Sequence, residues 1–315
     1  MKILVTGANG FVGKSLCAEL SLRGHAVRMA SRVAVDEFAN FEQVISGSIG
    51  PDTNWLSALN DLDAVIHLAA RVHVMKDTAA DPLAEFRKVN VAGTLNLARQ
   101  AAAMGIKRFV FLSSVKVNGE YTLSGQAFTE LDIAAPQDAY GVSKHEAEMG
   151  LRQIALTTGM EVVIIRPPLV YGPGVKANFA ALMRAVQRGW PFPLGTVHNQ
   201  RSLVALDNLV DFIVACTVHP HAANQTFLVS DGQDLSAAEL VQGLARAASV
   251  SAYLLPVPVW VLQAAAALAG KGDAMQRLCG NLQVDTSKAR KLLDWMPPVS
   301  VNDGLILAIA GRDKA

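Results

Sequence analysis

A chain of 315 residues, of which 51% are hydrophobic and 17% charged, can bury the core of one large α/β unit and a smaller lobe. Its formal net charge of +1 and its lack of a long Lys/Arg run exclude the charge pattern typical of nucleic-acid-binding proteins. The three cysteines and seven histidines show no disulfide or metal-ligand spacing, so we expect reduced thiols in a cytoplasmic protein and no metal site.

The first half of the chain alternates short apolar strands with helical patterns. Strands are expected at residues 3–5, 26–30, 64–68, 108–113 and 162–166, and helices at 12–23, 82–104 and 140–158. This alternation predicts an α/β fold with a Rossmann-type, doubly wound parallel sheet covered by helices on both faces. Such sheets bind ligands at the carboxyl ends of their strands.

After residue 166 the alternation stops and prolines and glycines become frequent. We therefore predict a dinucleotide-binding domain over residues 1–166 and a smaller C-terminal α+β substrate lobe over residues 167–315. The segment 201–218 has the pattern of an element that returns to the first domain. The apolar stretch 254–270 is shorter than the ~20 residues of a membrane span, so we expect a buried or partner-facing helix and no integral membrane segment.

A glycine-rich turn follows the first strand and opens the first helix. Its spacing, TGANGFVG, is GxxGxxG: Gly7 permits the tight turn, Gly10 lets the backbone approach a pyrophosphate, and Gly13 lets helix and strand pack closely. The free N–H groups of the helix N-terminus then face the phosphates. The turn predicts a dinucleotide site that includes Gly7, Asn9, Gly10, Phe11, Val12 and Gly13.

The end of the second strand indicates which cofactor is bound. NAD enzymes usually hold an acid there for the ribose 2′-hydroxyl, whereas a nearby arginine suits a 2′-phosphate. Here the strand ends in Ser31 and Arg32, and the nearest carboxylate after it is Asp36. The pair favours NADP over NAD. The alternative is that Arg32 is a solvated surface arginine and the site binds NAD without an acid.

A tyrosine and a lysine four residues apart are the candidate catalytic pair. On a helix, Tyr140 and Lys144 lie on one face. A nearby ammonium favours the phenolate, so we expect Lys144 to lower the tyrosine pKa. Ser114 closes the fourth strand and would bind the same substrate oxygen. Ser113 competes for this role, but adjacent strand residues point to opposite faces, so only one of the two can reach the substrate.

With these motifs together, the sequence resembles an extended short-chain dehydrogenase/reductase, and is particularly similar to the nucleotide-sugar epimerases, dehydratases and 4-keto reductases. The TGxxGxxG loop, Ser114 and the YxxxK motif carry the resemblance, and the segments 67–70, 90–94 and 166–174 extend it. It implies that Asn90 supports the strand carrying the catalytic serine. It also implies further cofactor contacts at Ser48, Ile49, Leu68, Ala69, Ala70, Asn90, Tyr140, Lys144 and Pro167.

The resemblance implies a UDP-sugar substrate and a homodimer in which the helices at 82–104 and 140–158 pair into a four-helix bundle. Substrate contacts are implied at Arg71, His73, Ser114, Val115, Asn178, Leu194, Gly195 and Arg201.

Other interpretations of single residues stay open. Asn178 would equally cap a helix, and Arg201 would form a surface salt bridge. Arg71 and His73 would be ordinary loop residues. His67 and Trp295 are expected in the core.

Two departures from the family pattern bear on the reaction. Many members carry an acid at the position of Ser31 and another within residues 47–49, where this chain has Ser48. A tightly held NAD is thereby disfavoured, and the sequence favours a 4-keto reductase of a UDP-4-keto-6-deoxy-N-acetylhexosamine in bacterial surface-polysaccharide sugar biosynthesis. The alternative is a UDP-glucose or UDP-N-acetylglucosamine 4-epimerase. A distant alternative is a cofactor-sensing binding protein without catalysis, which typically loses the tyrosine or the lysine.

Overall fold

The computed structural model describes residues 1–72, 81–268, 270 and 272–311. Its centre is a seven-stranded sheet in which every neighbouring pair is parallel, in the order β3-β2-β1-β4-β5-β6-β9. The predicted doubly wound sheet is thus confirmed. The strands are β1 (Lys2–Thr6), β2 (Ala26–Ser31), β3 (Glu42–Ile45), β4 (Ala64–His67), β5 (Arg108–Leu112), β6 (Glu161–Arg166) and β9 (Thr226–Leu228).

The strand order reverses between β1 and β4, which lie side by side at the middle of the sheet. The chain runs outward from β1 through β2 to β3, and from β4 through β5 and β6 to β9. Crossovers leave in opposite directions at this switch point, and in such sheets ligands bind beyond the carboxyl ends of the two strands. Cofactor residues are therefore expected after Thr6 and after His67.

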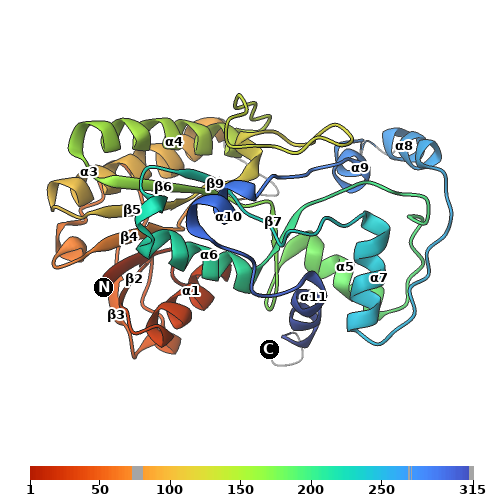
Figure 1. The fold of residues 1–315 in the computed structure, drawn as a ribbon, viewed down its shortest axis with the longest axis horizontal. Coiled ribbons are helices and arrows are strands. Elements are labelled where there is room, and N and C mark those ends of the chain that lie inside the picture. Colours follow the sequence, from red (N-terminus) through yellow and green to blue (C-terminus); the bar gives the residue numbers. More distant parts are fainter. Residues whose placement is uncertain (73–80, 269, 271, 312–315) are drawn as a thin grey trace.

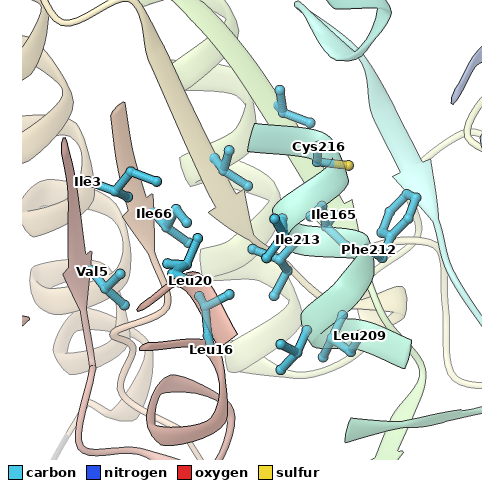
Figure 2. Close-up of a cluster of buried hydrophobic side chains, with 14 of the residues drawn as sticks. Ile3, Val5, Leu16, Leu20, Ile66, Ile165, Leu209, Phe212, Ile213 and Cys216 are labelled. Atoms are coloured by element: carbon cyan, nitrogen blue, oxygen red, sulfur yellow. The ribbon is translucent and has the colours of Figure 1, made fainter. Parts of the chain in front are cut away.

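Helices cover both faces of the sheet (Figure 1). On one face, α1 (Phe11–Leu22) and α6 (Leu206–Val218) pack on the sheet, and Figure 2 shows Ile3 and Val5 in one cluster with Leu16 and Ile213. On the other face, α3 (Thr94–Ala103) and α4 (Ala139–Thr158) pack on Leu4 and its neighbours. Alternate residues of β1 thus enter opposite cores, as the two-residue period of a strand requires.

Two strands of the sheet are not predicted by the sequence pattern. In β3, Glu42, Gln43, Val44 and Ile45 include no fully buried residue. In β9 only three residues pair, joining the sheet at its far edge beside β6. Both strands are too short to show a clear periodicity.

The remainder of the chain builds a second hydrophobic core beside the sheet, at the right in Figure 1. Its helices are α5 (Ala177–Gln187), α7 (Ala237–Ala247) and α11 (Val301–Ala310), and the short parallel strands β7 (Leu169–Tyr171) and β8 (Leu203–Ala205) adjoin it. Smaller elements are α2 (Pro82–Phe86), a π-helical segment (Arg87–Gly93), α8 (Val259–Leu268), α9 (Gly272–Cys279), α10 (Ser287–Leu293) and 3-10 turns at Asp36–Phe38, Leu56–Leu59, Val115–Val117 and Pro220–Ala222.

The division of the chain at residue 166 stays a prediction. Helix α6 packs on α1 through the shared core, and β9 pairs with β6, so residues 206–218 and 226–228 lie against the sheet. Any dinucleotide-binding domain drawn here would include both segments.

The apolar stretch at 254–270 contains α8, whose Trp260 and Leu268 are 70% and 93% exposed. No helix within the described ranges combines the length and the apolar character that crossing a bilayer requires.

Candidate active site

The glycine-rich turn after β1 has no room for larger residues. Gly7 has a φ of +69°, and a Cβ on Gly13 would lie 2.2 Å from the Gly7 carbonyl oxygen. Gly10 is the N-cap of α1 and supplies no side-chain hydrogen bond, and Asn9 and Gly10 are exposed. The first N–H groups of α1 therefore have no side-chain cap and face an exposed loop. This cradle fits the pyrophosphate of a dinucleotide.

We expect Gly13→Ala to weaken cofactor binding at least about tenfold, since forcing a methyl group into a packed contact costs about 1–3 kcal/mol. The added carbon must push α1 away from the turn at the Gly7 carbonyl. Titration of the protein with NAD and NADP, followed by calorimetry, measures the change. Gly272→Ala is the matched control because its Cβ would meet nothing within 4 Å. Equal affinities of the two variants would contradict the close-packing role of Gly13.

At the end of β2, Ser31 and Arg32 were both expected to suit a cofactor phosphate, and the structure differs from this expectation at Ser31. Ser31 is buried, and its hydroxyl donates a 2.6 Å hydrogen bond to the Val33 carbonyl oxygen. The hydroxyl is thus engaged by the chain's own backbone. Arg32 is exposed, and after β3 the predicted cofactor residue Ser48 is exposed and Ile49 is half-buried. Of the predicted Ser31–Arg32 pair, Arg32 is the better placed for a phosphate.

The residues after β4 line the other side of the switch point. His67 is fully buried, hydrogen-bonded through Nδ1 to the Thr6 hydroxyl (2.7 Å) and through Nε2 to the Thr94 hydroxyl (2.9 Å). Burial lowers the pKa of His67 to about 3, and the charge of Lys144 adds to the effect, so it is a neutral core residue as expected. The half-buried cofactor candidates Leu68, Ala69 and Ala70 follow it.

Asn90 lies in the π-helical segment and is 1% exposed. Its side chain accepts a hydrogen bond from the Arg71 amide (2.7 Å) and donates to the Arg71 carbonyl (3.1 Å) and to the Ser143 hydroxyl (3.0 Å). These bonds hold the segment after β4 and the helix α4, rather than β5. The role implied by the family resemblance, support of the strand carrying the serine, is therefore corrected.

Tyr140 and Lys144 lie on one face of α4, as predicted. The Lys144 side chain is 2% exposed, and its Nζ donates to the Leu112 carbonyl at 2.7 Å and lies 5.9 Å from the centre of the Tyr140 ring. Asp138 caps the helix by accepting from the Gly141 amide at 2.7 Å. The backbone end of β5 thus holds the ammonium beside the tyrosine.

The titration of this pair differs from the expectation. Burial raises the pKa of Tyr140 well above its usual range, and the Asp138 charge adds to this effect. Burial also lowers the pKa of Lys144 to about 7, although the Glu148 carboxylate opposes the shift. Removing both groups from water disfavours both charged forms, and one ammonium does not offset that cost. Additional positive charge is needed to make Tyr140 a base near neutrality.

Ser113 and Ser114, the two candidates for contact with the substrate oxygen, have different surroundings. Ser113 is 3% exposed and donates a 2.6 Å hydrogen bond to Glu148. Ser114 is half-buried and accepts a 3.3 Å bond from the Lys116 amide as β5 ends. Ser113 therefore serves the core, and Ser114 stays the candidate for the substrate oxygen.

We expect Ser114→Ala to lower kcat by about 10²-fold or more, in the range found when one donor to a reacting oxygen is removed. Ser113→Ala should instead lower stability by about 1–3 kcal/mol, because Glu148 loses a buried partner. Steady-state kinetics and urea unfolding of both variants measure the two effects. The reverse pattern would assign the substrate contact to Ser113.

A buried ion pair on the core side of α4 was not predicted. Glu148 is fully buried one turn after Lys144, and both its oxygens accept from the Arg166 guanidinium, at 2.9 Å and 2.5 Å. The third Arg166 nitrogen, Nη1, donates to the Asn118 Oδ1 at 2.9 Å. The pair joins α4 to the end of β6. The sequence carried one signal for this pair, because Glu148 is a charged residue on the apolar side of the helix predicted at 140–158.

The predicted substrate residues lie in different parts of the structure. Val115 is buried in a cluster with Leu228, Leu282 and Val284. Leu194 is buried, and the Gly195 amide donates to the Leu255 carbonyl at 2.9 Å.

Three more substrate candidates have defined surroundings. Asn178 is exposed and does not cap α5, whose N-cap is Lys176, so the capping alternative is wrong. The Arg71 guanidinium lies 5.5 Å from the centre of the Phe86 ring. The predicted residue His73 lies outside the described residues.

Arg201 is half-buried and donates a 3.0 Å hydrogen bond to the Gly280 carbonyl. Burial lowers its pKa, and the charge of Glu120 opposes the shift. A partly desolvated guanidinium is a strong binding group for a phosphate.

A sequence model of the NAD dependent epimerase/dehydratase family matches residues 3–230 of the chain. The chain belongs to this family. One relative, a UDP-glucose 4-epimerase from Vibrio cholerae, is 51% identical over 306 residues. The match covers 96% of this chain and 92% of that protein. A GDP-6-deoxy-D-mannose reductase from Pseudomonas aeruginosa is 29% identical and covers 82% of this chain and 83% of that protein.

Solved structures agree with this assignment. The UDP-glucose 4-epimerase of Thermotoga maritima, determined with UDP-glucose, has a TM-score of 0.80 at 25% identity and covers 100% of this chain and 99% of its own. RMD from Pseudomonas aeruginosa, complexed with NADPH, shares the fold with a TM-score of 0.74 at 24% identity and 99% coverage of both chains. The resemblance to extended short-chain dehydrogenases/reductases is thereby confirmed, and the protein is an NAD(P)-dependent enzyme of that type.

Proposed function

We propose that this enzyme is a UDP-hexose 4-epimerase, acting on UDP-glucose or UDP-N-acetylglucosamine. The observation that carries the proposal is the 51% identity with the UDP-glucose 4-epimerase of Vibrio cholerae across nearly the full length of both chains. The proposal also fits Ser114, Tyr140 and Lys144, which lie at the ends of β5 and the start of α4. A cofactor-sensing protein without catalysis is disfavoured, because this relative is an enzyme and both Tyr140 and Lys144 are present.

The nicotinamide cofactor, held by the glycine-rich turn after β1, would supply the hydride acceptor and donor for C4 of the sugar, and epimerisation requires that the hydride return to the opposite face of C4. Tyr140 would remove the proton from O4 and give it back, while Ser114 holds the oxygen by a hydrogen bond. Lys144 would hold positive charge beside the phenol. Because burial keeps the Tyr140 pKa high, the positive charge of an oxidised nicotinamide ring would be needed as well to favour the phenolate. Without the positive charge of the oxidised ring, Tyr140 would stay protonated and would be suited to donate its proton.

A second candidate is a 4-keto reductase of a UDP-4-keto-6-deoxy-N-acetylhexosamine, which the sequence favoured first. The observation that supports it is Arg32, exposed at the end of β2 where an NAD enzyme usually has an acid. An NADP-specific site suits a reductase, which consumes one reduced cofactor in each turnover. The relative from Pseudomonas aeruginosa with 29% identity is named a reductase.

To discriminate between the epimerase and the reductase, one protein preparation freed of bound nucleotide is tested for both reactions. UDP-glucose or UDP-N-acetylglucosamine with NAD should yield the C4 epimer without net reduction of NAD, as followed by chromatography. The 4-keto sugar with NADPH should then give no loss of the reduced-nicotinamide absorbance. Stoichiometric NADPH loss without epimerisation would assign the reductase instead. Activity in neither assay would overturn both candidates.

The Arg32→Ala variant tests whether the enzyme prefers NADP or NAD. If Arg32 binds a 2′-phosphate, Arg32→Ala should weaken NADPH binding about tenfold or more and leave NADH binding within about twofold. Calorimetric titration with both nucleotides measures this. Equal losses for the two would show that Arg32 does not select the cofactor.

We also propose a homodimer formed by α2, the π-helical segment and α3 together with α4. Met149 and Leu156 lie seven residues apart on α4 and are 49% and 82% exposed, which marks an apolar stripe. Arg87 pairs with Glu146 beside it. Sedimentation equilibrium should give twice the mass of the 33.5 kDa chain, and Met149→Glu should shift the protein to monomer. A monomeric wild-type protein would contradict the proposal.

A further inference from the structure

A lysine next to the catalytic serine pairs with the residue that caps the catalytic helix. Lys116 lies in the 3-10 turn Val115–Val117, directly after Ser114, and its amide donates to the Ser114 hydroxyl. Its Nζ contacts the Asp138 carboxylate in a short ion pair and Glu120 at 2.9 Å. The Lys116 and Glu120 side chains are only 19% and 15% exposed, so their charges are screened less by water than those of surface pairs.

Asp138 is both a helix cap and a charge beside the tyrosine. One oxygen accepts from the Gly141 amide, and the other takes the Lys116 ammonium. Although burial opposes it, the hydrogen bonds from Lys116 and from Gly141 keep the pKa of Asp138 below its ordinary value. The carboxylate is thus ionised throughout the physiological range. Tyr140 follows two residues later, and the negative charge of Asp138 acts on its phenol.

The backbone packing also ties the lysine to the helix. A Cβ on Gly141 would lie 2.9 Å from the Lys116 carbonyl oxygen, so the first turn of α4 rests directly on the turn after β5. The side-chain ion pair and this close approach join the same two segments. One segment carries Ser114 and the other Tyr140.

We propose that Lys116 is a positioning residue that neutralises the Asp138 carboxylate beside Tyr140, so that the helix cap does not hold the tyrosine in its protonated form. The inference rests on the role proposed above for Tyr140 as the acid and base of the reaction. The cap needs an oxygen acceptor at the N-terminus of α4, and Asp138 supplies one together with a full negative charge. Without a counter-charge, that carboxylate would oppose formation of the phenolate.

Other charges around the phenol come from α4, the turn after β5, the segment after β4 and α9. In α9, Arg277 pairs with Glu120 at 3.6 Å, and its charge helps to lower the pKa of Asp138. On α4 itself, the Lys144 ammonium lies 5.9 Å from the centre of the Tyr140 ring, and Glu148 follows one turn later. The turn after β5 contributes Lys116 and Glu120. The segment after β4 contributes Arg71, whose guanidinium lies against Phe86 of α2, and that ring packs edge-on against Tyr140 at 6.2 Å. Asp138 is the one whose charge raises the Tyr140 pKa.

The test titrates Tyr140 directly and therefore does not depend on the sugar substrate. The protein is labelled with [ζ-13C]tyrosine and saturated with oxidised cofactor, and the signal missing from Tyr140→Phe identifies Tyr140 among the four tyrosines. Relative to wild type, Lys116→Met should raise the Tyr140 midpoint by about one pH unit. Lys116→Arg keeps the charge and should leave the midpoint unchanged.

The double variant Lys116→Met/Asp138→Asn shows whether the shift of the Tyr140 midpoint comes from the charge of Asp138 or from a change in the structure of α4. Asparagine caps a helix about as well as aspartate, so α4 keeps its start while the negative charge is lost. The midpoint should return close to the wild-type value. Asp138→Asn alone should lie below wild type, and this variant tests the proposal even if Lys116→Met folds poorly. A Lys116→Met midpoint equal to wild type, or a shift that Asp138→Asn fails to reverse, would overturn the proposal.

Turnover measured on the same variants separates this inference from the proposed function. If the enzyme is an epimerase or a reductase, the pH profile of kcat should move with the Tyr140 midpoint in each variant. Wild-type protein that turns over neither sugar but shows the expected order of midpoints would refute the proposed function alone.

Discussion

Replacing Tyr140 by phenylalanine should lower kcat by about 10²–10⁴-fold, the contribution typical of a positioned acid or base. The ring keeps its edge-on contact with Phe86, so the loss of one hydroxyl leaves the packing of α4 intact. Cofactor affinity should change by less than about threefold, because the phosphate loop and β2 are untouched. Steady-state kinetics with the active substrate, and calorimetric titration of the cofactor, measure both quantities.

Tyr253→Phe is the matched control. Tyr253 is 56% exposed and lies between α7 and α8, far along the chain from α4, so its hydroxyl should be dispensable. A Tyr140→Phe enzyme with wild-type kcat would remove the tyrosine from the chemistry and leave Ser114 and Lys144 without their expected partner. A large loss of thermal stability in the same variant would instead indicate a structural hydroxyl.

Replacing Glu148 by glutamine should destabilise the protein by about 3–5 kcal/mol, the cost typical of removing one partner from a buried ion pair. Arg166 is 3% exposed and would keep its charge with only the Asn118 oxygen and a neutral amide as acceptors. Ser113 would also lose its charged acceptor. Urea unfolding monitored by circular dichroism gives the free energy of unfolding of the variant and of the wild type.

Glu146→Gln is the control on the same helix. Glu146 pairs with Arg87, but the Arg87 side chain is 51% exposed, and an exposed pair contributes about 0.2–1 kcal/mol. Equal losses of stability for the two variants would show that the buried position of Glu148 adds nothing. Loss of activity in Glu148→Gln at full stability would assign it a part in the reaction.

The sequence determined the elements that are governed by local rules. The alternation of strands and helices predicted the parallel sheet because each short-range pattern, of period two or 3.6, agrees with the final packing. The spacing of Gly7, Gly10 and Gly13 predicted the tight turn between β1 and α1, since only glycine tolerates those backbone approaches. Tyr140 and Lys144 were found together because four residues on a helix span one turn.

Only the tertiary structure decided what depends on distant parts of the chain. Ser113 and Ser114 are equivalent in sequence, and the choice follows from Glu148, which α4 brings beneath β5. Glu148 and Arg166 meet because α4 and β6 are neighbours, and Lys116 reaches Asp138 because the first turn of α4 rests on the turn after β5.

The titration of Tyr140 shows the physical reason most directly. From the sequence, a nearby ammonium predicts a lowered pKa, whereas burial in the folded chain raises it. Local spacing specifies which charges are close, but the loss of water around them is a property of the whole fold, and desolvation is the larger effect here.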